Sequence, residues 1–317
     1  MPGTRRAVID IGTNSVKLLV ADVSGRVVQP VVEVSEQTRL GNGFYEANRL
    51  QAQAIAATAK AVADFATQAR NTGATEPRII ATSAARDALN TAELTGAIEQ
   101  ASGLKVEVIS GEQEADWAFQ GVTSDPDLAS QPLLLLDVGG GSTEFILGQG
   151  EHKHFRHSFQ LGTVRLMEKF PHSDPPTPQE LAANRQWVAD FLEKEVRPKL
   201  GPALRREKKL DSERRPVQLI GTGGTTTILA RMEAQLDTFD RERIEATRLR
   251  LAQVRTHVER LWSLPLAERT NIIGLPKKRR DVILPGVVIY EGVMQAFEFN
   301  ELRISTRGLR FAALMDA

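Results

Sequence analysis

The sequence contains no cysteine, which excludes disulfide bonds, thiolate catalysis and zinc sites with thiolate ligands. This composition suits a reducing cytoplasm, where we expect the protein to reside. Neither charge is in excess, because 40 Lys and Arg residues balance 40 Asp and Glu residues. We therefore expect no general coat protein for nucleic acid, although a local basic groove stays possible.

Long apolar runs are also missing. No run approaches the roughly 20 residues of a membrane helix, so no membrane partner is expected. The apolar stretch after Arg5 and Arg6 is interrupted at once by Asp10, so we expect no secretory leader. The sequence also lacks a Gly-x-Ser-x-Gly elbow and a His-x-x-x-His pair. The usual signatures of serine hydrolases and helical zinc sites are therefore absent.

The 317 residues are enough for two domains with full cores. Strand and helix patterns alternate in both halves, which predicts the α/β class. The proline-containing loop at 126–132 suggests a boundary, with an N-terminal domain over 1–125 and a C-terminal domain over 126–317. The last helix, about 306–317, is free to pack back onto the first domain.

Hydrophobic patterns predict three consecutive antiparallel strands at 7–11, 16–23 and 27–34. Thr177, Pro178 and Glu180 form a capping-box pattern, which predicts a helix from there to about Pro198. The basic runs at 205–209, 214–215 and 277–280 are interpreted as solvated loops. One of them is also able to guide a long polyanion.

The most informative feature is a glycine turn that occurs twice, 127 residues apart. Asp10 precedes the first glycine turn, which consists of Gly12, Thr13, Asn14 and Ser15 and is followed by Lys17. Asp137 precedes the second, which consists of Gly139, Gly140, Gly141 and Ser142 and is followed by Glu144. Each turn lies between apolar runs, so the repeat predicts two similar domains that face one another. Each offers backbone N–H groups, a hydroxyl and a carboxylate to a phosphate–metal complex.

The two turns differ in how strongly they indicate a ligand. Asp10 ends a buried strand, where a carboxylate is costly unless it meets a metal or donors; a plain polar hairpin turn is the alternative. Three successive glycines in the second turn exceed what a hairpin needs and expose backbone that can wrap an anion. Asp137 and Glu144 flank it as candidate Mg²⁺ ligands, the alternative being a surface pair without metal.

A third glycine loop follows a predicted strand and precedes a helix, which is the setting where phosphate binds a helix N-terminus. It consists of Gly221, Thr222, Gly223, Gly224 and Thr225. It is not a Walker A motif, because no Gly-Lys-[Ser/Thr] follows.

Glu112 and Glu114 lie in the first turn of a predicted helix. Complementation of the helix dipole explains such residues more simply than a general base for water does, and both interpretations stay open. Arg86 and Arg39 are candidate phosphate clamps, although most arginines are surface residues.

Taken together, these motifs resemble the exopolyphosphatase/guanosine pentaphosphate phosphohydrolase (Ppx/GppA) family of the actin-like superfamily. The resemblance runs nearly from end to end. It implies two ribonuclease-H-like domains with a cleft between them, and Mg²⁺-dependent hydrolysis of a terminal phosphoanhydride in inorganic polyphosphate or pppGpp. Long family members carry a further helical region with an HD-type domain. This sequence stops at Ala317, which suggests a short two-domain member and casts doubt on a dimeric polyphosphate channel.

The resemblance also implies roles for individual residues. Glu114 matches the catalytic glutamate, whereas Glu112 falls at a variable position. Asp137 and Glu144 match the metal-associated carboxylates, with Asp10 as a further metal candidate. Arg86 and Lys17 match cationic positions, and the three glycine segments match the phosphate-binding loops.

The expected function is therefore that of a Mg²⁺-dependent exopolyphosphatase with Glu114 as general base. The close alternative is hydrolysis of pppGpp to ppGpp. More distant ones are an actin-like kinase that binds ATP and a non-catalytic sensor of polyphosphate or alarmone. Chain-length preference, the metal requirement and the oligomeric state, monomer or homodimer, are not readable from the sequence.

Overall fold

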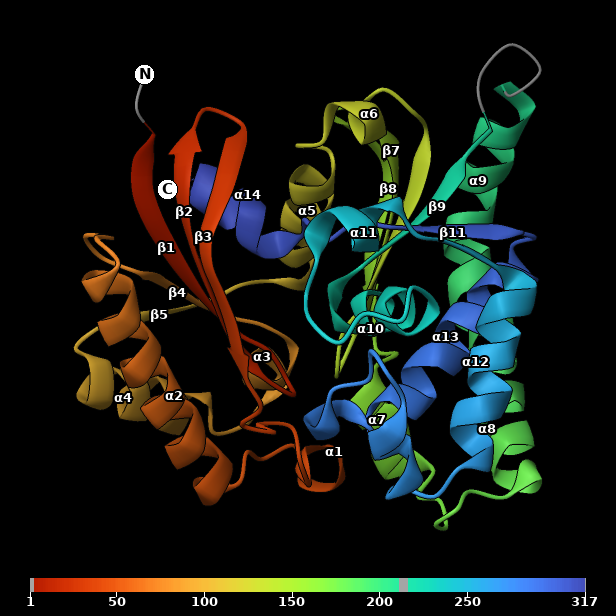
Figure 1. Ribbon diagram of the computed structural model, residues 1–317, viewed down its shortest axis with the longest axis horizontal. Coiled ribbons are helices and arrows are strands. Elements are labelled where there is room, and N and C mark those ends of the chain that lie inside the picture. Colours follow the sequence, from red (N-terminus) through yellow and green to blue (C-terminus); the bar gives the residue numbers. More distant parts are fainter. Residues whose placement is uncertain (1–2, 211–215, 317) are drawn as a thin grey trace. The chain divides into compact units, whose positions relative to one another are not determined.

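The computed structural model describes residues 3–210 and 216–316, which form two compact units. The first consists of Met1–Ser124 together with Arg307–Ala317, and the second of Asp125–Thr306. Mixed sheets with helices on their faces confirm the predicted α/β class (Figure 1). None of the helices in the described residues combines the length and apolarity needed to cross a membrane.

The first unit is built on a five-stranded sheet whose first three strands are antiparallel and whose last two run parallel to the central one. In sheet order the strands are β3 (Val27–Glu36), β2 (Val16–Ser24), β1 (Thr4–Ile11), β4 (Arg78–Ala81) and β5 (Val106–Val108). The three antiparallel strands expected at the start of the chain are therefore confirmed. Direct pairing of Asp10 with Lys17 places these two side chains on the same face of the sheet.

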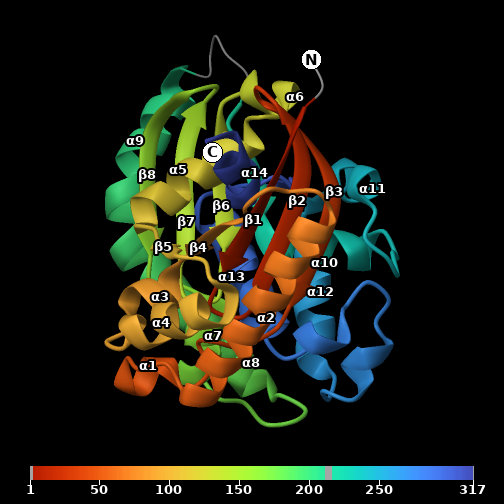
Figure 2. The same cartoon turned by 90° about the vertical axis from the view of Figure 1, so that its left-hand side faces the viewer.

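The side chains of these strands alternate between the two faces of the sheet, and helices cover both faces. The helices of the unit are α1 (Phe44–Ala47), α2 (Ala52–Asn71), α3 (Ser83–Asp87), α4 (Thr91–Ser102), α5 (Gly111–Val122) and α14 (Leu309–Met315). Ile9 and Ile11 pack with the apolar stripe of α2, whereas Val8 packs with residues of α5 and α14. Figure 2 shows α14 beside α5. Because strand side chains alternate, Asp10 lies on the same face as Val8, the face that α5 covers.

The second unit repeats this topology and adds one edge strand. In sheet order its strands are β10 (Arg248–Arg250), β11 (Glu301–Ile304), β9 (Gln218–Thr222), β6 (Leu133–Val138), β7 (Thr143–Gln149) and β8 (His152–Phe159). Strands β6, β7 and β8 are antiparallel, and β9 and β11 run parallel to β6. The same order of a three-stranded meander followed by parallel strands explains why the glycine turn occurs twice.

The α-helices of this unit are α6 (Pro126–Ala129), α7 (Thr163–Lys169), α8 (Pro178–Phe191), α9 (Arg197–Leu210), α10 (Gly223–Glu233), α11 (Arg241–Ala246), α12 (Leu251–Ser263) and α13 (Ile283–Ala296). All of them except α6 contribute buried side chains to the larger core. Leu134, Leu136 and Val138 point into this core. Asp137 therefore lies on the opposite face, together with its cross-strand partner Glu144.

Several local predictions need correction. The loop expected at 126–132 contains the short helix α6, whose N-cap Asp125 accepts from the N–H of Asp127. The capping box at Thr177 is confirmed, but the helix does not end near Pro198. It continues through a π-helical turn, η1 (Leu192–Val196), into α9. The basic run at 205–209 is therefore helical, the run at 277–280 begins with the 3₁₀ turn η3 (Lys277–Arg279), and residues 214–215 lie outside the described residues.

Candidate active site

In the first unit, three adjacent parallel strands end at the same edge of the sheet. Ile11 of β1 is aligned with Ala81 of β4, and Ala81 with Val108 of β5. Just beyond the strands, the N–H of Thr82 donates to Ile11 O at 3.1 Å, and the N–H of Ile109 donates to Ala81 O at 3.0 Å. Ligands of α/β folds bind at this carboxyl edge. The first glycine turn, the segment carrying Arg86 and the start of α5 with Glu114 all follow from it.

The first glycine turn is closed and braced through its carbonyl groups. The N–H of Gly12 donates to Ser15 O at 3.0 Å, the N–H of Gly41 donates to Thr13 O at 2.7 Å, and the N–H of Arg39 donates to Asn14 O at 3.1 Å. The chain at 39–41, where Arg39 was a candidate clamp, thus supports the turn through its backbone.

Two polar atoms, one just before this turn and one within it, are buried without a partner in the described part of the chain. They are Oδ1 of Asp10 and Nδ2 of Asn14, whose residues are 5% and 6% exposed. A buried acceptor and a buried donor left open at one turn are uncommon in folded proteins and point to a missing ligand. Asp10 faces a cation as well, because Lys17 Nζ lies 3.9 Å from its Oδ2.

Arg86 and Glu114 form an ion pair beside this edge of the sheet. Arg86 Nη1 donates to Glu114 Oε2 at 3.0 Å and to Ile109 O at 3.2 Å. Helix α5 begins at an N-cap, Ser110, whose hydroxyl accepts from the N–H of Gln113 at 3.1 Å. The cap fixes the first turn of α5 and with it the direction of Glu114. Glu112, by contrast, is exposed.

The second glycine turn has the same closure as the first. The N–H of Gly139 donates to Ser142 O at 2.9 Å, which repeats the bond between Gly12 and Ser15. Helix α7 braces it, because the N–H of Val164 donates to Gly140 O at 2.8 Å and Arg165 Nε donates to Gly141 O at 3.0 Å. Nothing in the sequence pattern singled out Arg165 for this contact.

Within the described residues, the backbone N–H groups of Gly140 and Gly141 have no protein acceptor, whereas their carbonyl groups are bonded. Carbonyl groups turned inward and N–H groups left open suit an anion, because adjacent N–H groups form a concave nest of positive charge.

Asp137 and Glu144 are direct partners across the β6–β7 ladder, so both side chains project from the same face. Glu144 is 1% exposed, and its Oε1 accepts from Ser142 Oγ at 2.8 Å and from Ser158 Oγ at 2.6 Å. Two hydroxyl donors compensate for burial of this carboxylate. Ser158 is a site neighbour that sequence reasoning missed, because only the β7–β8 pairing brings it opposite Glu144.

The third glycine loop is shorter than expected, since Gly221 and Thr222 belong to β9 and helix α10 begins at Gly223. Gly221 packs in the core, where an added Cβ would lie 3.1 Å from both Leu302 and Tyr290. Gly223 has a φ of +86°, and a side chain there would overlap Asp137 Oδ1. Asp137 thus lies against the N-terminal end of α10, where helix N–H groups favour anions.

Arg279 is a cationic neighbour that sequence reasoning had assigned to a solvated loop. It ends η3, and a Cβ added to Gly224 would lie 3.7 Å from its guanidinium nitrogens. The arginine therefore approaches the N-terminal end of α10, close to Gly223, Gly224 and Thr225. Nothing local in the run at 277–280 distinguishes Arg279 from its basic neighbours.

The carboxylates proposed as metal ligands fit Mg²⁺ in their chemistry. Within the described residues, no three Asp, Glu or His side chains gather into a metal site of their own. Mg²⁺ commonly binds through one or two carboxylates together with substrate phosphates and water, so a complete protein cage is not required. The open Oδ1 of Asp10 and the paired carboxylates of Asp137 and Glu144 meet that description.

The comparisons with known proteins agree on one family. The profile of the Ppx/GppA phosphatase family matches residues 19–316. Among curated proteins, exopolyphosphatase 2 of Mycobacterium tuberculosis is 35% identical over 303 residues, which cover 91% of this chain and 89% of that protein.

Solved structures give the same result for the fold. An exopolyphosphatase from Cytophaga hutchinsonii superposes with a TM-score of 0.83 at 26% identity, covering 99% of this chain and 98% of that one. The Ppx/GppA enzyme of Aquifex aeolicus gives a TM-score of 0.77 at 28% identity, covering 99% of each chain. The two-domain actin-like fold implied by the motifs is confirmed. The chain belongs to the Ppx/GppA phosphatase family.

Proposed function

We propose that this protein is an exopolyphosphatase, which hydrolyses the terminal phosphoanhydride bond of inorganic polyphosphate and releases orthophosphate. The observation that carries the proposal is the Arg86–Glu114 pair at 3.0 Å, at the sheet edge that also bears the first glycine turn. The pair supplies a carboxylate for a water molecule and a guanidinium for phosphoryl oxygens. The similarity to exopolyphosphatase 2 supports polyphosphate as the substrate.

In the proposed reaction, water attacks the terminal phosphorus and the bond to the bridging oxygen breaks. Glu114 accepts a proton from the water, and the shortened chain leaves with the bridging oxygen. Arg86 and Lys17 offset negative charge on the phosphoryl oxygens, and the first glycine turn binds them through Thr13, Asn14 and Ser15. Such positioning and charge stabilisation account for most enzymatic phosphoryl transfer.

The second unit contributes phosphate and metal ligands of the same kind. N–H groups of Gly140 and Gly141 and the N-terminal end of α10 bind phosphoryl oxygens. Asp10 in the first unit, and Asp137 and Glu144 in the second, are the Mg²⁺ ligands that we propose for each unit taken by itself; bound Mg²⁺ would neutralise charge on the phosphates.

The close alternative is hydrolysis of pppGpp to ppGpp, which uses the same bond chemistry. The Ppx/GppA family name includes that activity, and the family match does not separate the two substrates. Glu114 supplies the carboxylate that a catalytic water needs, and this favours hydrolysis. An actin-like kinase or a sensor does not need to activate water, so both are less consistent with the site.

The test is phosphate release in the presence of Mg²⁺ from short-chain polyphosphate, long-chain polyphosphate and pppGpp in parallel. We expect release from polyphosphate, and a loss of about 10²- to 10⁴-fold for Glu114→Gln, the usual share of a general base. Glu112→Gln is the matched control, because Glu112 lies in the same helical turn but is exposed. Phosphate release from pppGpp alone would show that pppGpp, and not polyphosphate, is the substrate. Near-normal turnover by Glu114→Gln would refute the assignment of Glu114 as the general base.

A further inference from the structure

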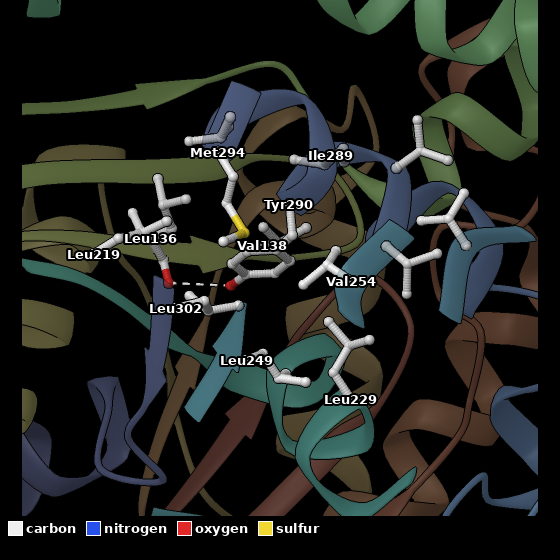
Figure 3. Close-up of a cluster of buried hydrophobic side chains, with 14 of the residues drawn as sticks. Leu136, Val138, Leu219, Leu229, Leu249, Val254, Ile289, Tyr290, Met294 and Leu302 are labelled. Carbon is white, nitrogen blue, oxygen red and sulfur yellow. Dashed lines mark hydrogen bonds between the residues drawn. The ribbon is translucent and has the colours of Figure 1, made fainter. Parts of the chain in front are cut away.

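Tyr290 places a hydroxyl group at the end of the strands that carry the second unit's phosphate ligands. It lies on α13, is fully buried, and its ring packs among Leu136, Val138 and Met294 (Figure 3). Its hydroxyl lies 3.3 Å from Leu136 O on β6 and 3.3 Å from Thr222 O on β9. The hydroxyl hydrogen can be donated to either strand, so one side chain connects the two.

The two carbonyl groups immediately precede site residues. Leu136 is followed by Asp137, and Thr222 by Gly223. Asp137 and Thr222 form the last aligned pair of the β6–β9 ladder. The hydroxyl therefore lies where the ladder stops and the two strands are free to diverge. Any such divergence would move the Asp137 carboxylate away from the N-terminal end of α10.

The surroundings of the hydroxyl keep it in the form that can donate a hydrogen bond. Burial raises the pKa of the phenol well above its usual value, so the hydroxyl stays protonated and able to donate. On the ring side, Gly221 leaves no gap, because a Cβ there would lie 3.1 Å from Tyr290 Cε1.

We infer that Tyr290 is a positioning residue, whose hydroxyl fixes Asp137 against the N-terminal end of α10. Filling the core requires only the aromatic ring, which phenylalanine would provide equally well. The hydroxyl adds contacts to β6 and β9, and each of these strands bears a proposed metal or phosphate ligand. The inference rests on the proposed function for its catalytic consequence, whereas its structural part stands on these contacts.

Tyr290→Phe tests the inference because it keeps the ring and removes the hydroxyl. Trp262→Phe is the matched control: the indole is buried in the same core, and its Nε1 donates to Leu284 O at 3.2 Å. Both variants lose one buried bond to a carbonyl group. Only Tyr290→Phe loses a bond beside Asp137 and Gly223.

The first readout is phosphate release from polyphosphate during a Mg²⁺ titration, below the unfolding temperature of each variant. We expect Tyr290→Phe to lower kcat at least tenfold and to raise the Mg²⁺ concentration for half-maximal rate, with both unchanged in Trp262→Phe. If both variants lower only the unfolding midpoint and turn over like the wild type, Tyr290 has a packing role and the inference is wrong.

The second readout is hydrogen exchange of backbone amides without substrate, which does not depend on activity. We expect faster exchange at Val138–Gly141 and Gly223–Thr225 in Tyr290→Phe than in Trp262→Phe. Equal exchange in these segments would overturn the inference. If the wild type releases no phosphate from any substrate but this exchange difference is found, the proposed function fails while the positioning role stands.

Discussion

Arg86 Nη1 and Glu114 Oε2 lie 3.0 Å apart, so a direct hydrogen bond joins the proposed phosphate clamp to the proposed general base. The two side chains are 21% and 12% exposed, which limits competition from water. The ion pair requires an ionised Glu114, the form in which a carboxylate accepts a proton. A cation that orients this base and also contacts phosphate would couple substrate binding to catalysis.

The first prediction is that Arg86→Met and Glu114→Gln affect the rate non-additively. Arg86→Met should lower kcat by about 10²- to 10³-fold, the loss typical for one stabilising group in an active site. The double variant should be little worse than Glu114→Gln, because residues that act as a unit are not independent. Phosphate release by the four proteins of the cycle measures this, and strictly additive effects would contradict the pairing.

Arg49→Met is the control for that cycle. Arg49 pairs with Glu93 at 3.1 Å in the same unit, but both side chains are more than half exposed. An exposed ion pair contributes at most about 1 kcal/mol to stability. Because Arg49 is not one of the proposed site residues, its replacement should leave kcat unchanged.

The second prediction concerns Gly223, whose backbone and surroundings both require glycine. At a φ of +86° a side chain is strained, and a Cβ would overlap Asp137 Oδ1. Gly223→Ala should therefore cost about 1–3 kcal/mol and displace the Asp137 carboxylate. We expect phosphate release to fall at least tenfold and its Mg²⁺ requirement to rise. Unchanged Mg²⁺ dependence would show that Asp137 does not contribute to metal binding.

Gly96→Ala is the control, because the same substitution at this position should raise stability and not lower it. Gly96 lies exposed within α4, and nothing approaches an added Cβ within 4 Å. Alanine there should stabilise the protein by about 1 kcal/mol, because glycine is a poor helix former. Thermal unfolding of the two variants separates a helix effect from the contact with Asp137.

The sequence predicts those features that neighbouring residues determine, and it fails where packing between distant residues decides the outcome. Strand alternation around both glycine turns and the capping box at Thr177 are local, and the structure confirms them. The stop expected near Pro198 is wrong because burial overrides local propensity. Leu192, Leu200 and Leu204 extend one apolar stripe into the core, so the helix continues past two prolines.

The site residues that sequence reasoning missed have a common reason. Ser158 meets Glu144 only through strand pairing, and Arg279 meets Gly224 only through the fold of the second unit. The hydroxyl of Tyr290 lies 154 positions in sequence from its acceptor on Leu136. Neither spacing nor composition contains these contacts, whereas a glycine turn is a pattern of neighbouring residues that can be read directly from the sequence.

The third prediction is that Glu180 makes stability depend on pH under acidic conditions. Backbone N–H groups of Thr177 and Ser173 donate to its carboxylate and lower the pKa of Glu180 from 4.5 to about 2. A carboxylate whose pKa is lowered in the folded state stabilises the fold at pH values above its pKa in the unfolded state. That contribution is lost as the pH falls through 4.5 toward 2.

Unfolding midpoints between pH 6 and pH 3 test this, with Glu180→Gln compared to wild type. The glutamine variant should be less stable at pH 6, and the difference should shrink as the pH approaches 3. Glu195→Gln, which replaces an exposed carboxylate of η1, should show no such convergence. A constant difference between wild type and Glu180→Gln across this range would contradict the assigned ionisation.

The fourth prediction concerns Arg269, a fully buried arginine in the segment that precedes η3. Its Nε donates to Leu261 O and Leu264 O at 3.0 and 3.1 Å, and its Nη1 donates to Arg280 O at 3.1 Å. Burial lowers the pKa of this guanidinium, so the charge is kept at a cost that the three carbonyl groups offset. Arg269 thereby joins the end of α12 to the residue that follows Arg279.

Arg269→Met keeps the aliphatic stem and leaves those carbonyl groups without a donor, so we expect a loss of about 3 kcal/mol. Urea unfolding measures it, with Arg255→Met as a control at a half-exposed arginine of α12. Because Arg280 loses its bond, the 3₁₀ turn that carries Arg279 should also loosen, and backbone amides of 276–281 should exchange faster. A stability loss without faster exchange there would show that Arg269 stabilises α12 but does not hold Arg279 beside Gly224.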